Sequence, residues 1–600
     1  MKLLLVLLLI LVAVGCSQQD AGSTTPTSPE RPAYHPTVTP LITPVPLILT
    51  PVSTPELLPP LPPFIDSQSS KTLALAGSIL LTVNSWSDSI TLLDTLSKKV
   101  IREIEVGDDP RAIAVYGTEA LVTLRGEDAL ALIDLNSKAL SAVYPVCHMP
   151  YGVVTSGQFA YVACFADDQI VVFDLESREV ISRLDVEDAP AGLALSGEWL
   201  LVTHFYSGGV TLAAISPMPY VFGTANVEPD GSLAQSIILT PDGKSAYLPL
   251  TRTGLALISL QYMQDWFPAV AVLDLTTMTG SRDRRLTLSE IDQSPANMPF
   301  DAAFSLDGKV LYVALAGSDA LAVVDVATGT LLARLPVGAN PRGVLISDGY
   351  GYALNMLDGS VSVFDPSHYT MMETIPVTQL PLDPQQHRGA VLFHQAADPS
   401  LSDGAISCAT CHFDGGMDAR TWINFRSGPR NTLALGSADL PPYNWAGDMP
   451  ELQDTIEDHI LQVMLGDGLN TADLAALTDY AASFSPWRSP YREPDGALND
   501  SAQRGMELFM SGSPNCACHA PPSYADGRQH NVTGAAFSME EFESFDTPTL
   551  QGLWATAPYM HDGVAQTLEE VLTRTDPIHS VGANLTPQQL QDLIMFLLSL

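Results

Sequence analysis

The sequence feature that most constrains the fold is a repeat of about 40 residues between positions 70 and 380. Seven short apolar runs recur there, and all but the fourth end in aspartate. The runs end at Asp94, Asp134, Asp174, Ala214, Asp274, Asp325 and Asp365. Pro110, Pro150 and Pro190 keep the same 40-residue step. The longer gap before Asp274 predicts an inserted loop between about 216 and 236.

Within a unit the pattern is two apolar strands, a turn, the run that ends in aspartate, and an alternating fourth strand. Four short strands per unit are typical of a propeller blade, so the seven units predict an all-β seven-bladed propeller over residues 67–380. The aspartate ends its strand because its carboxylate can accept amide hydrogen bonds in the following turn. Residues 307–314 and 340–344 also resemble the YVTN-type propellers, a resemblance that implies fold but not function.

Two cysteines lie inside this repeat. Cys147 comes just before Pro150, and Cys164 ends the second strand of the same unit. The entry of a blade and the end of its second strand can meet at one rim, so we expect a disulfide. The alternative is a soft metal site that includes His148 or Met149.

The N-terminus indicates export. The apolar run that follows Lys2 is too short to span a bilayer and ends in small residues before Cys16. Residues 1–16 thus resemble a lipoprotein signal with Cys16 as the lipidated residue; the alternative is an ordinary secretory signal. The Pro- and Thr-rich residues 17–66 favour an extended tether. We expect a chain that is lipid-anchored on the extracytoplasmic side of a bacterial membrane, in the periplasm or at the cell surface.

After about residue 384 the pattern becomes helical, with two cysteine motifs. Cys408, Cys411 and His412 form C-x-x-C-H, which is typical of covalent c-type haem attachment, the two thiols bonding the porphyrin and the histidine binding iron. A zinc site would need a second matching cysteine pair. This motif therefore predicts a haem c.

The second motif, Cys516, Cys518 and His519, is one residue shorter. Haem could attach here through Cys518 with His519 as ligand, and Cys516 could be free or form a strained second bond. Alternatively the site has lost haem, or one residue is missing from the sequence. We favour a second haem because Arg504-Gly505 upstream echoes Arg388-Gly389 before the first motif.

Residues 387–600 resemble the bacterial di-haem cytochrome c peroxidases and their relatives. The segments that carry the resemblance are 401–404, 408–412, 430–432, 445–448, 547–553, 556–563 and 568–572. The resemblance implies a mainly α pair of cytochrome c-like domains, which we place at 385–495 and 498–600. It also implies that Trp445 lies near the first haem and between the two, as an electron bridge or as aromatic packing, and that His561 lies next to a haem without binding its iron.

The chain departs from this family where peroxide chemistry would need distal groups. Thr455 occupies the place of the family's glutamine, and the Glu-Met pair is missing. For the sixth ligand of the first haem we expect Met464, with His459 or an open site as alternatives. For the second haem Thr575 replaces the family's Met or Tyr, and His579 is the candidate.

The net charge of −39 argues against binding of nucleic acid. Three functions remain open. The first is electron transfer through one or two haems, with the propeller docking a partner that is a redox protein or a small electron acceptor. The second is a peroxidase-type oxidoreductase that reduces hydrogen peroxide or oxidises a partner. The third is a propeller that binds a ligand beside a redox-sensing haem.

Overall fold

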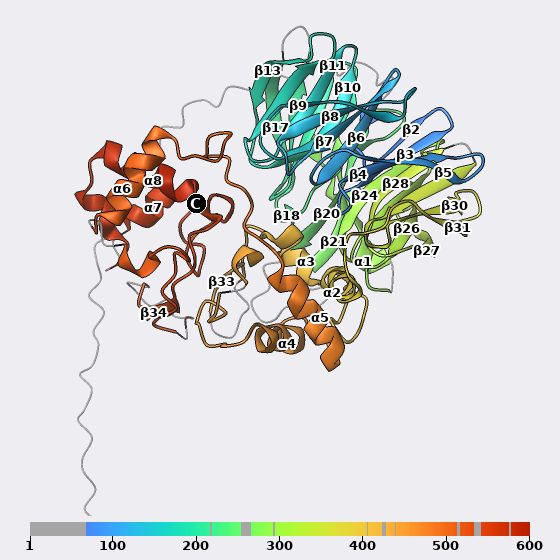
Figure 1. The fold of residues 1–600 in the computed structure, drawn as a ribbon. Coiled ribbons are helices and arrows are strands. Elements are labelled where there is room, and N and C mark those ends of the chain that lie inside the picture. Colours follow the sequence, from blue (N-terminus) through green and yellow to red (C-terminus); the bar gives the residue numbers. More distant parts are fainter. Residues whose placement is uncertain are drawn as a thin grey trace, which may run out of the picture. The chain divides into compact units, whose positions relative to one another are not determined.

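Seven antiparallel sheets follow one another along the first half of the chain, and helices follow in the second half (Figure 1). The computed structural model describes residues 68–600 except 216–218, 254–265, 292–293, 348, 405, 423–427, 439, 513–515, 533–539, 541 and 575–577. Cys16 and the tether therefore lie outside the described residues. In the part that is described, no helix is long and apolar enough to cross a membrane.

The first three blades each contain four strands in sequence order. They are β2 (Leu73–Ala76), β3 (Ile79–Asn84), β4 (Ser89–Asp94) and β5 (Lys99–Glu105); β6 (Pro110–Tyr116), β7 (Glu119–Leu124), β8 (Ala129–Asp134) and β9 (Ala139–Pro145); and β10 (Pro150–Ser156), β11 (Phe159–Cys164), β12 (Gln169–Asp174) and β13 (Glu179–Asp185).

The remaining four blades complete the ring of seven sheets, and one of them gains the short N-terminal strand β1 (Gln68–Ser69) beside β14. Their strands are β14 (Pro190–Ser196), β15 (Trp199–His204), β16 (Gly208–Ala214) and β17 (Tyr220–Glu228); β18 (Gly231–Ser232), β19 (Ile238–Leu239), β20 (Ser245–Thr253), β21 (Trp266–Asp274), β22 (Thr279–Gly280) and β23 (Leu286–Thr287); β24 (Pro299–Phe304), β25 (Val310–Leu315), β26 (Ala320–Asp325) and β27 (Leu331–Pro336); and β28 (Pro341–Ser347), β29 (Tyr350–Asn355), β30 (Ser360–Asp365) and β31 (Thr370–Pro376). A short helix, α1 (Leu288–Ile291), follows β23.

The predicted seven-bladed propeller is confirmed, and so is the reason for its aspartates. Asp94 Oδ1 accepts hydrogen bonds from the backbone N–H groups of Leu96 and Ser97 at 3.0 and 2.7 Å. Because these bonds satisfy the turn that follows the strand, the same residue recurs at the same place in six blades. Burial follows the predicted pattern too, since the middle strand β12 is buried and the outer strand β13 alternates.

The predicted insertion at 216–236 is wrong. Residues 220–228 form β17 and residues 231–232 form β18, as ordinary parts of blades 4 and 5. The extra length lies between Thr253 and Trp266 and in β20 and β21, which have nine residues each. The spacing of the aspartates shows how many residues are added between Ala214 and Asp274. It does not show at which strand or loop between these two positions they are added.

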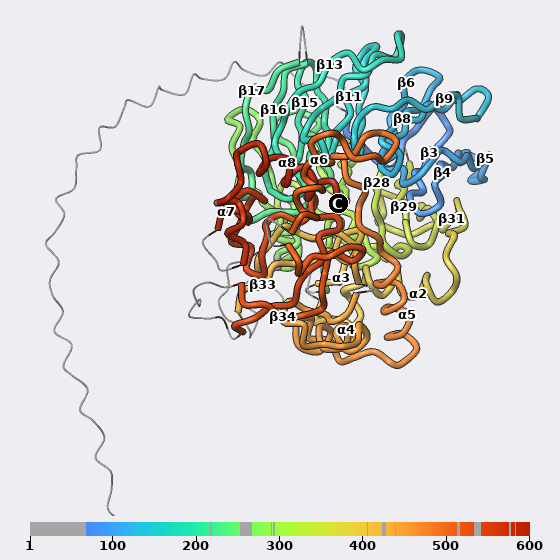
Figure 2. Tube along the Cα trace, turned by 60° about the vertical axis from the view of Figure 1, so that its left-hand side comes forward, coloured from blue at the N-terminus to red at the C-terminus, as the bar shows by residue number. Residues whose placement is uncertain are grey.

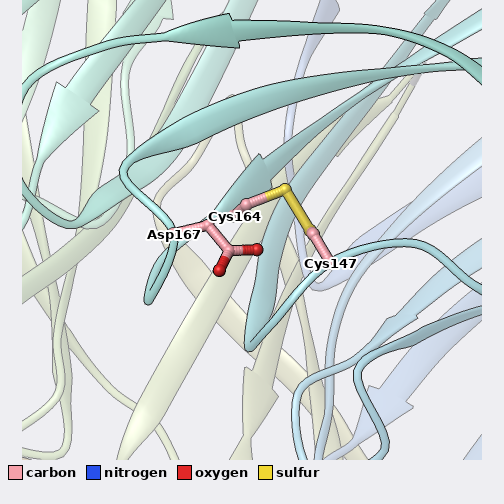
Figure 3. Close-up of side chains that lie close together, drawn as sticks. All are labelled: Cys147, Cys164 and Asp167. Carbon is pink, nitrogen blue, oxygen red and sulfur yellow. A yellow bond between two sulfur atoms is a disulfide. The ribbon is translucent and has the colours of Figure 1, made fainter. Parts of the chain in front are cut away.

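Cys147 and Cys164 form a disulfide at the rim of blade 3, with Asp167 beside it (Figure 3). The carboxylate of Asp167 is 2.7 Å from His148 Nδ1. The sulfur atoms of Cys147 and Cys164 are bonded to each other, and His148 pairs with Asp167. The thiolate ligands that the alternative metal site requires are therefore missing.

Seven helices follow the propeller in the part of the chain that is described: α2 (Pro384–His394), α3 (Cys408–Cys411), α4 (Leu452–Gln462), α5 (Thr471–Ala482), α6 (Asp500–Met510), α7 (Leu568–Thr573) and α8 (Pro587–Leu598). Two pairs of them, α2 with α5 and α6 with α8, repeat one design. Two short ladders join β32 (Thr421–Trp422) to β33 (Arg430–Asn431) and β34 (Gln529–His530) to β35 (Phe545–Asp546).

Glycine and arginine play the same role in both pairs. A Cβ on Gly389 of α2 would lie 2.1 Å from the carbonyl oxygen of Ala476 in α5, and one on Gly505 of α6 would lie 1.9 Å from that of Asp592 in α8. Each preceding arginine pairs with an aspartate of the facing helix, Arg388 with Asp473 and Arg504 with Asp592. The repeated Arg-Gly thus marks a structural duplication.

The two helical regions differ in how they are buried. The first helical region (385–495) shares one apolar core with an end of the propeller, in which Phe205, Phe300 and Leu357 pack with Phe393 and Phe413. The second helical region (498–600) has a core of its own around Phe509 and Phe596. Figure 2 shows the same chain as a trace, with the helices in orange and red.

Candidate functional site

Both cysteine motifs line one cavity of about 1150 Å³. This volume exceeds the roughly 300–1,000 Å³ of a site for one small molecule. Its walls come from both helical regions and include Cys408, His412, Cys518, His519 and Trp445. The structure therefore brings the predicted attachment residues of the two motifs to a common interior space.

The first motif forms the single turn α3. Ser407 begins it through a capping box with Thr410, and this arrangement holds the two cysteines on one turn. Burial raises the pKa of the Cys408 thiol to about 12. Burial, with repulsion from His459 as a smaller cause, lowers the pKa of His412 to about 4, so its imidazole is neutral, as an iron ligand must be.

His459 and Met464 both line the cavity near the first motif. His459 lies on α4, and its Nδ1 hydrogen bonds the carbonyl oxygen of Thr455 at 2.8 Å, which leaves Nε2 as the ring nitrogen free to bind a metal. His412 and His459 both line the cavity. Thr455, which stands in the place of the family's glutamine, donates a hydrogen bond from its hydroxyl to the carbonyl oxygen of Glu451.

The second motif lies in a turn of 3₁₀ helix over residues 517–519. Nδ1 of His519 hydrogen bonds the carbonyl oxygen of Tyr524 at 3.0 Å, which fixes the tautomer and presents Nε2 as the metal-binding atom. Burial lowers the pKa of His519 to about 4, and His579 is close enough to lower it further. His579 also lines the cavity.

The two cysteines of this motif have different surroundings. Cys516 lies against the apolar core of the second helical region, and burial raises its pKa to about 11. Sγ of Cys518 is 3.9 Å from Nδ1 of His530, and Nε2 of His530 is 2.9 Å from a carboxylate oxygen of Asp526. Cys518 directly precedes His519 in the sequence, and its thiol lies beside the imidazole of His530.

A buried carboxylate that the sequence does not point to contacts two residues that line this space, Arg430 and His561. The carboxylate of Glu540 forms two hydrogen bonds of 2.9 Å with Arg430 and lies 3.4 Å from Nε2 of His561. The side chains of Glu540 and His561 are 3% and 4% exposed. Arg430 and His561 stand in segments that carry the family resemblance, but Glu540 lies in no motif, and its sequence offers no signal beyond a pair of glutamates.

Trp445 lies next to this group. Its Nε1 donates to the carbonyl oxygen of Asn431 at 2.7 Å, and its ring meets that of His561 edge-on at 6.4 Å between centroids. Trp445 and His561 both line the cavity, and the place of Trp445 between two haems stays a prediction. The geometry is compatible with both of its expected roles, a bridge for electrons and a packing surface for a porphyrin.

Comparison with known proteins shows what about a third of the chain is similar to. Residues 544–578 match the RoxA-like, cytochrome c-like family. The C-terminal region is homologous to MauG and to cytochrome c peroxidases. The chain is 25% identical over 260 residues to the hydrazine synthase gamma subunit of Kuenenia stuttgartiensis, which covers 33% of this chain and 72% of the relative.

Two further relatives are similar to this chain at a comparable level of identity. The methylamine utilization protein MauG of Methylorubrum extorquens is 25% identical over 249 residues, or 32% of this chain and 69% of that protein. The cytochrome-c peroxidase IdrP1 of Denitromonas iodatirespirans is 23% identical over 287 residues, or 32% of this chain and 76% of that protein. These relatives imply covalently bound c-type haem, and the neutral histidines and paired thiols in the cavity fit that cofactor.

Proposed function

We propose that this chain is an exported electron-transfer protein that carries two c-type haems in one interior cavity. Cys408, Cys411 and His412 would hold the first, and Cys518 with His519 the second. When bound, haem supplies reversible one-electron exchange at its iron. The observation that carries the proposal is that both attachment motifs line the same cavity, with Trp445 and His561 in its wall.

The protein supplies the rest of the function by fixing ligands and excluding water. Hydrogen bonds to backbone carbonyl groups orient His459 and His519. A second histidine lines the cavity together with each attachment histidine, His459 with His412 and His579 with His519. We propose that these two residues would complete the coordination of the iron in each haem. An iron without an open position would exchange electrons without binding peroxide, so this arrangement would favour electron transfer.

A second function is supported by the group around Glu540. A peroxidase needs a buried base and a cation near the open face of a haem. His561 and Arg430 line the cavity, and the buried carboxylate of Glu540 contacts both. Burial alone would raise the pKa of Glu540, but the hydrogen bonds with Arg430 hold it below its usual value, so the carboxylate is ionised. The relationship to the cytochrome-c peroxidase IdrP1 agrees with this candidate.

Haem content and ferric spin state distinguish the two functions. A pyridine haemochrome assay with intact mass is expected to give two haems per chain, and the ferric protein is expected to be wholly low-spin and inert to hydrogen peroxide. A high-spin fraction that turns over peroxide rapidly would overturn electron transfer in favour of the peroxidase. Inactivation of that turnover by Glu540→Gln would then assign the base.

The location and partner are part of the same proposal. We propose lipidation at Cys16, with residues 17–66 as a tether, and a redox protein or a small electron acceptor as partner, docked on the propeller. Replacement Cys16→Ser is expected to move the protein from the membrane fraction to the soluble fraction. Binding of a partner by a chain in which Cys408 and Cys411 are replaced, with unchanged affinity, would instead support a propeller that acts as a binding module.

A further inference from the structure

The loop that follows the first haem motif is held by the propeller. Asp414, two residues after His412, has a left-handed backbone with φ of 49°. Its carboxylate meets three guanidinium groups: Arg111 at 2.7 Å, Arg125 at 3.3 Å and Arg342 at 3.4 Å. Arg111 and Arg125 belong to blade 2 and Arg342 belongs to blade 7. The contact therefore joins the haem motif to two distant parts of the propeller.

This group is buried and brings three guanidinium groups together. The arginine side chains are 8%, 8% and 2% exposed, and that of Asp414 is 11% exposed. Asp109 is the second acid, at 2.8 Å from Arg111 and 2.9 Å from Arg125. His394 accepts a hydrogen bond from Arg342 and is neutral, because burial lowers its pKa to about 4. Three guanidinium groups thus contact two carboxylates, and Asp88, Asp108 and Glu127 add negative charge around Asp109.

The charges lie one side chain away from the haem cavity. The guanidinium of Arg125 stands 4.9 Å from the ring centre of Trp487, and Trp487 Nε1 donates to the carbonyl oxygen of Asp414 at 3.3 Å. Trp487, Gly415 and Gly416 line the cavity beside His412. In such an interior, charges interact over this range with an effective dielectric constant of about 20 rather than that of water.

We propose that the propeller tunes the reduction potential of the first haem through Arg111, Arg125 and Arg342, whose guanidinium groups meet the carboxylate of Asp414 two residues after His412. Reduction of ferric to ferrous iron removes one positive charge from the haem, so a neighbouring positive charge stabilises the reduced form and raises the potential. The proposal rests on the proposed electron-transfer function, and it assigns the propeller a role within the chain in addition to any docking of a partner.

Spectroelectrochemical titration of the full-length, haem-loaded protein tests this. Two one-electron components are expected. Asp414→Asn removes a negative charge and is expected to raise the potential of one component, whereas Arg125→Gln removes a positive charge and is expected to lower it. Each shift is expected to change the ferrous-to-ferric ratio about tenfold at fixed potential, or about 59 mV. Arg125→Lys keeps the charge and is expected to restore the parental value.

The second component is an internal control, and Arg178→Gln, which removes an ion pair with Glu119 far from the haem motifs, is the matched surface control. A purely structural role would open the site to water and move both variants in the same direction. Shifts of equal sign, or no shift, would therefore overturn the proposal. If Arg125→Gln does not fold, Asp414→Asn is sufficient to test the proposal. Entry of water into a loosened site would lower the potential, whereas loss of the negative charge of Asp414 would raise it. Absence of two redox components would instead contradict the proposed function.

Discussion

The imidazole of His561 lies face to face with the ring of Phe545, with 3.7 Å between centroids and 16° between planes. Neither ring nitrogen of His561 makes a hydrogen bond within the described part of the chain. Packing rather than hydrogen bonding therefore fixes this imidazole, and Glu540 at 3.4 Å is the anion nearest to it.

Loss of the Glu540 carboxylate is expected to destabilise the protein. Glu540→Gln leaves Arg430 buried without its counter-ion, which typically costs about 3 kcal/mol. The measurement is the free energy of unfolding by denaturant. Asp473→Asn is the control, because its partner Arg388 is 45% exposed and such pairs contribute under about 1 kcal/mol. Equal effects of the two substitutions would contradict a buried ion pair at Glu540.

The distal ligand of the first haem can be assigned by spin state. His459→Ala is expected to convert one ferric haem from low-spin to high-spin, because the hydrogen bond to Thr455 directs Nε2 of His459 toward a metal. Met464→Leu is expected to leave the spectrum unchanged, since the thioether then only fills the cavity wall. Electron paramagnetic resonance checks both variants. The reverse result would assign Met464, the ligand that the sequence favours.

The irregular motif can be resolved by mass. Cys518→Ala is expected to release the second haem on acid–acetone extraction, because Cys518 directly precedes His519 as Cys411 precedes His412. Cys516→Ala is expected to keep both haems covalently bound. Intact mass after extraction counts the remaining haems. Loss of the second haem from the Cys516 variant as well would indicate two thioether bonds at this site.

Acid is expected to weaken the contact between the propeller and the first helical region. His394 has a folded pKa of about 4 against about 6.5 when unfolded, so the unfolded chain binds the extra proton between these values. Stability is then complete above pH 6.5 and falls by about 3 kcal/mol as the pH drops to 4. Thermal unfolding across this range measures it. His394→Gln should flatten the profile, and the exposed His368→Gln should not.

The disulfide of blade 3 is expected to stabilise the propeller. It closes a loop with a sequence separation of 17, for which chain entropy predicts about 3 kcal/mol. The double variant Cys147→Ala, Cys164→Ala should show this loss in denaturant unfolding followed by tryptophan fluorescence. Reduction of the parental protein should give the same loss, whereas haem content should not change.

What could be predicted from the sequence depended on the distance over which each pattern acts. The propeller was predictable because Asp94 and its equivalents bond to turns two and three residues away, so every blade carries its own local signal. The first motif was predictable because attachment chemistry fixes the spacing of Cys408, Cys411 and His412. The helix pairs were visible through a repeated Arg-Gly.

The remaining features depend on contacts that are distant in the sequence. Arg111 and Asp414 are separated by about 300 residues, and nothing near either one indicates the other. Glu540 became a candidate only when the fold placed it against Arg430 and His561. The sequence favours Met464 over His459, but it does not show which side chain reaches the iron, because the side-chain direction depends on how α4 ends and turns.

The apolar core that the propeller shares with α2 and α5 has a consequence for how such proteins can be rearranged. Phe205 and Phe300 of the propeller and Phe393 and Phe413 of the first helical region bury one another, so separating the chain between β31 and α2 would expose both surfaces to water. The second helical region keeps its own core around Phe509 and Phe596. An exchange with other cytochromes near residue 497 should therefore expose less apolar surface than one near residue 380, but it would divide the cavity that both helical regions line.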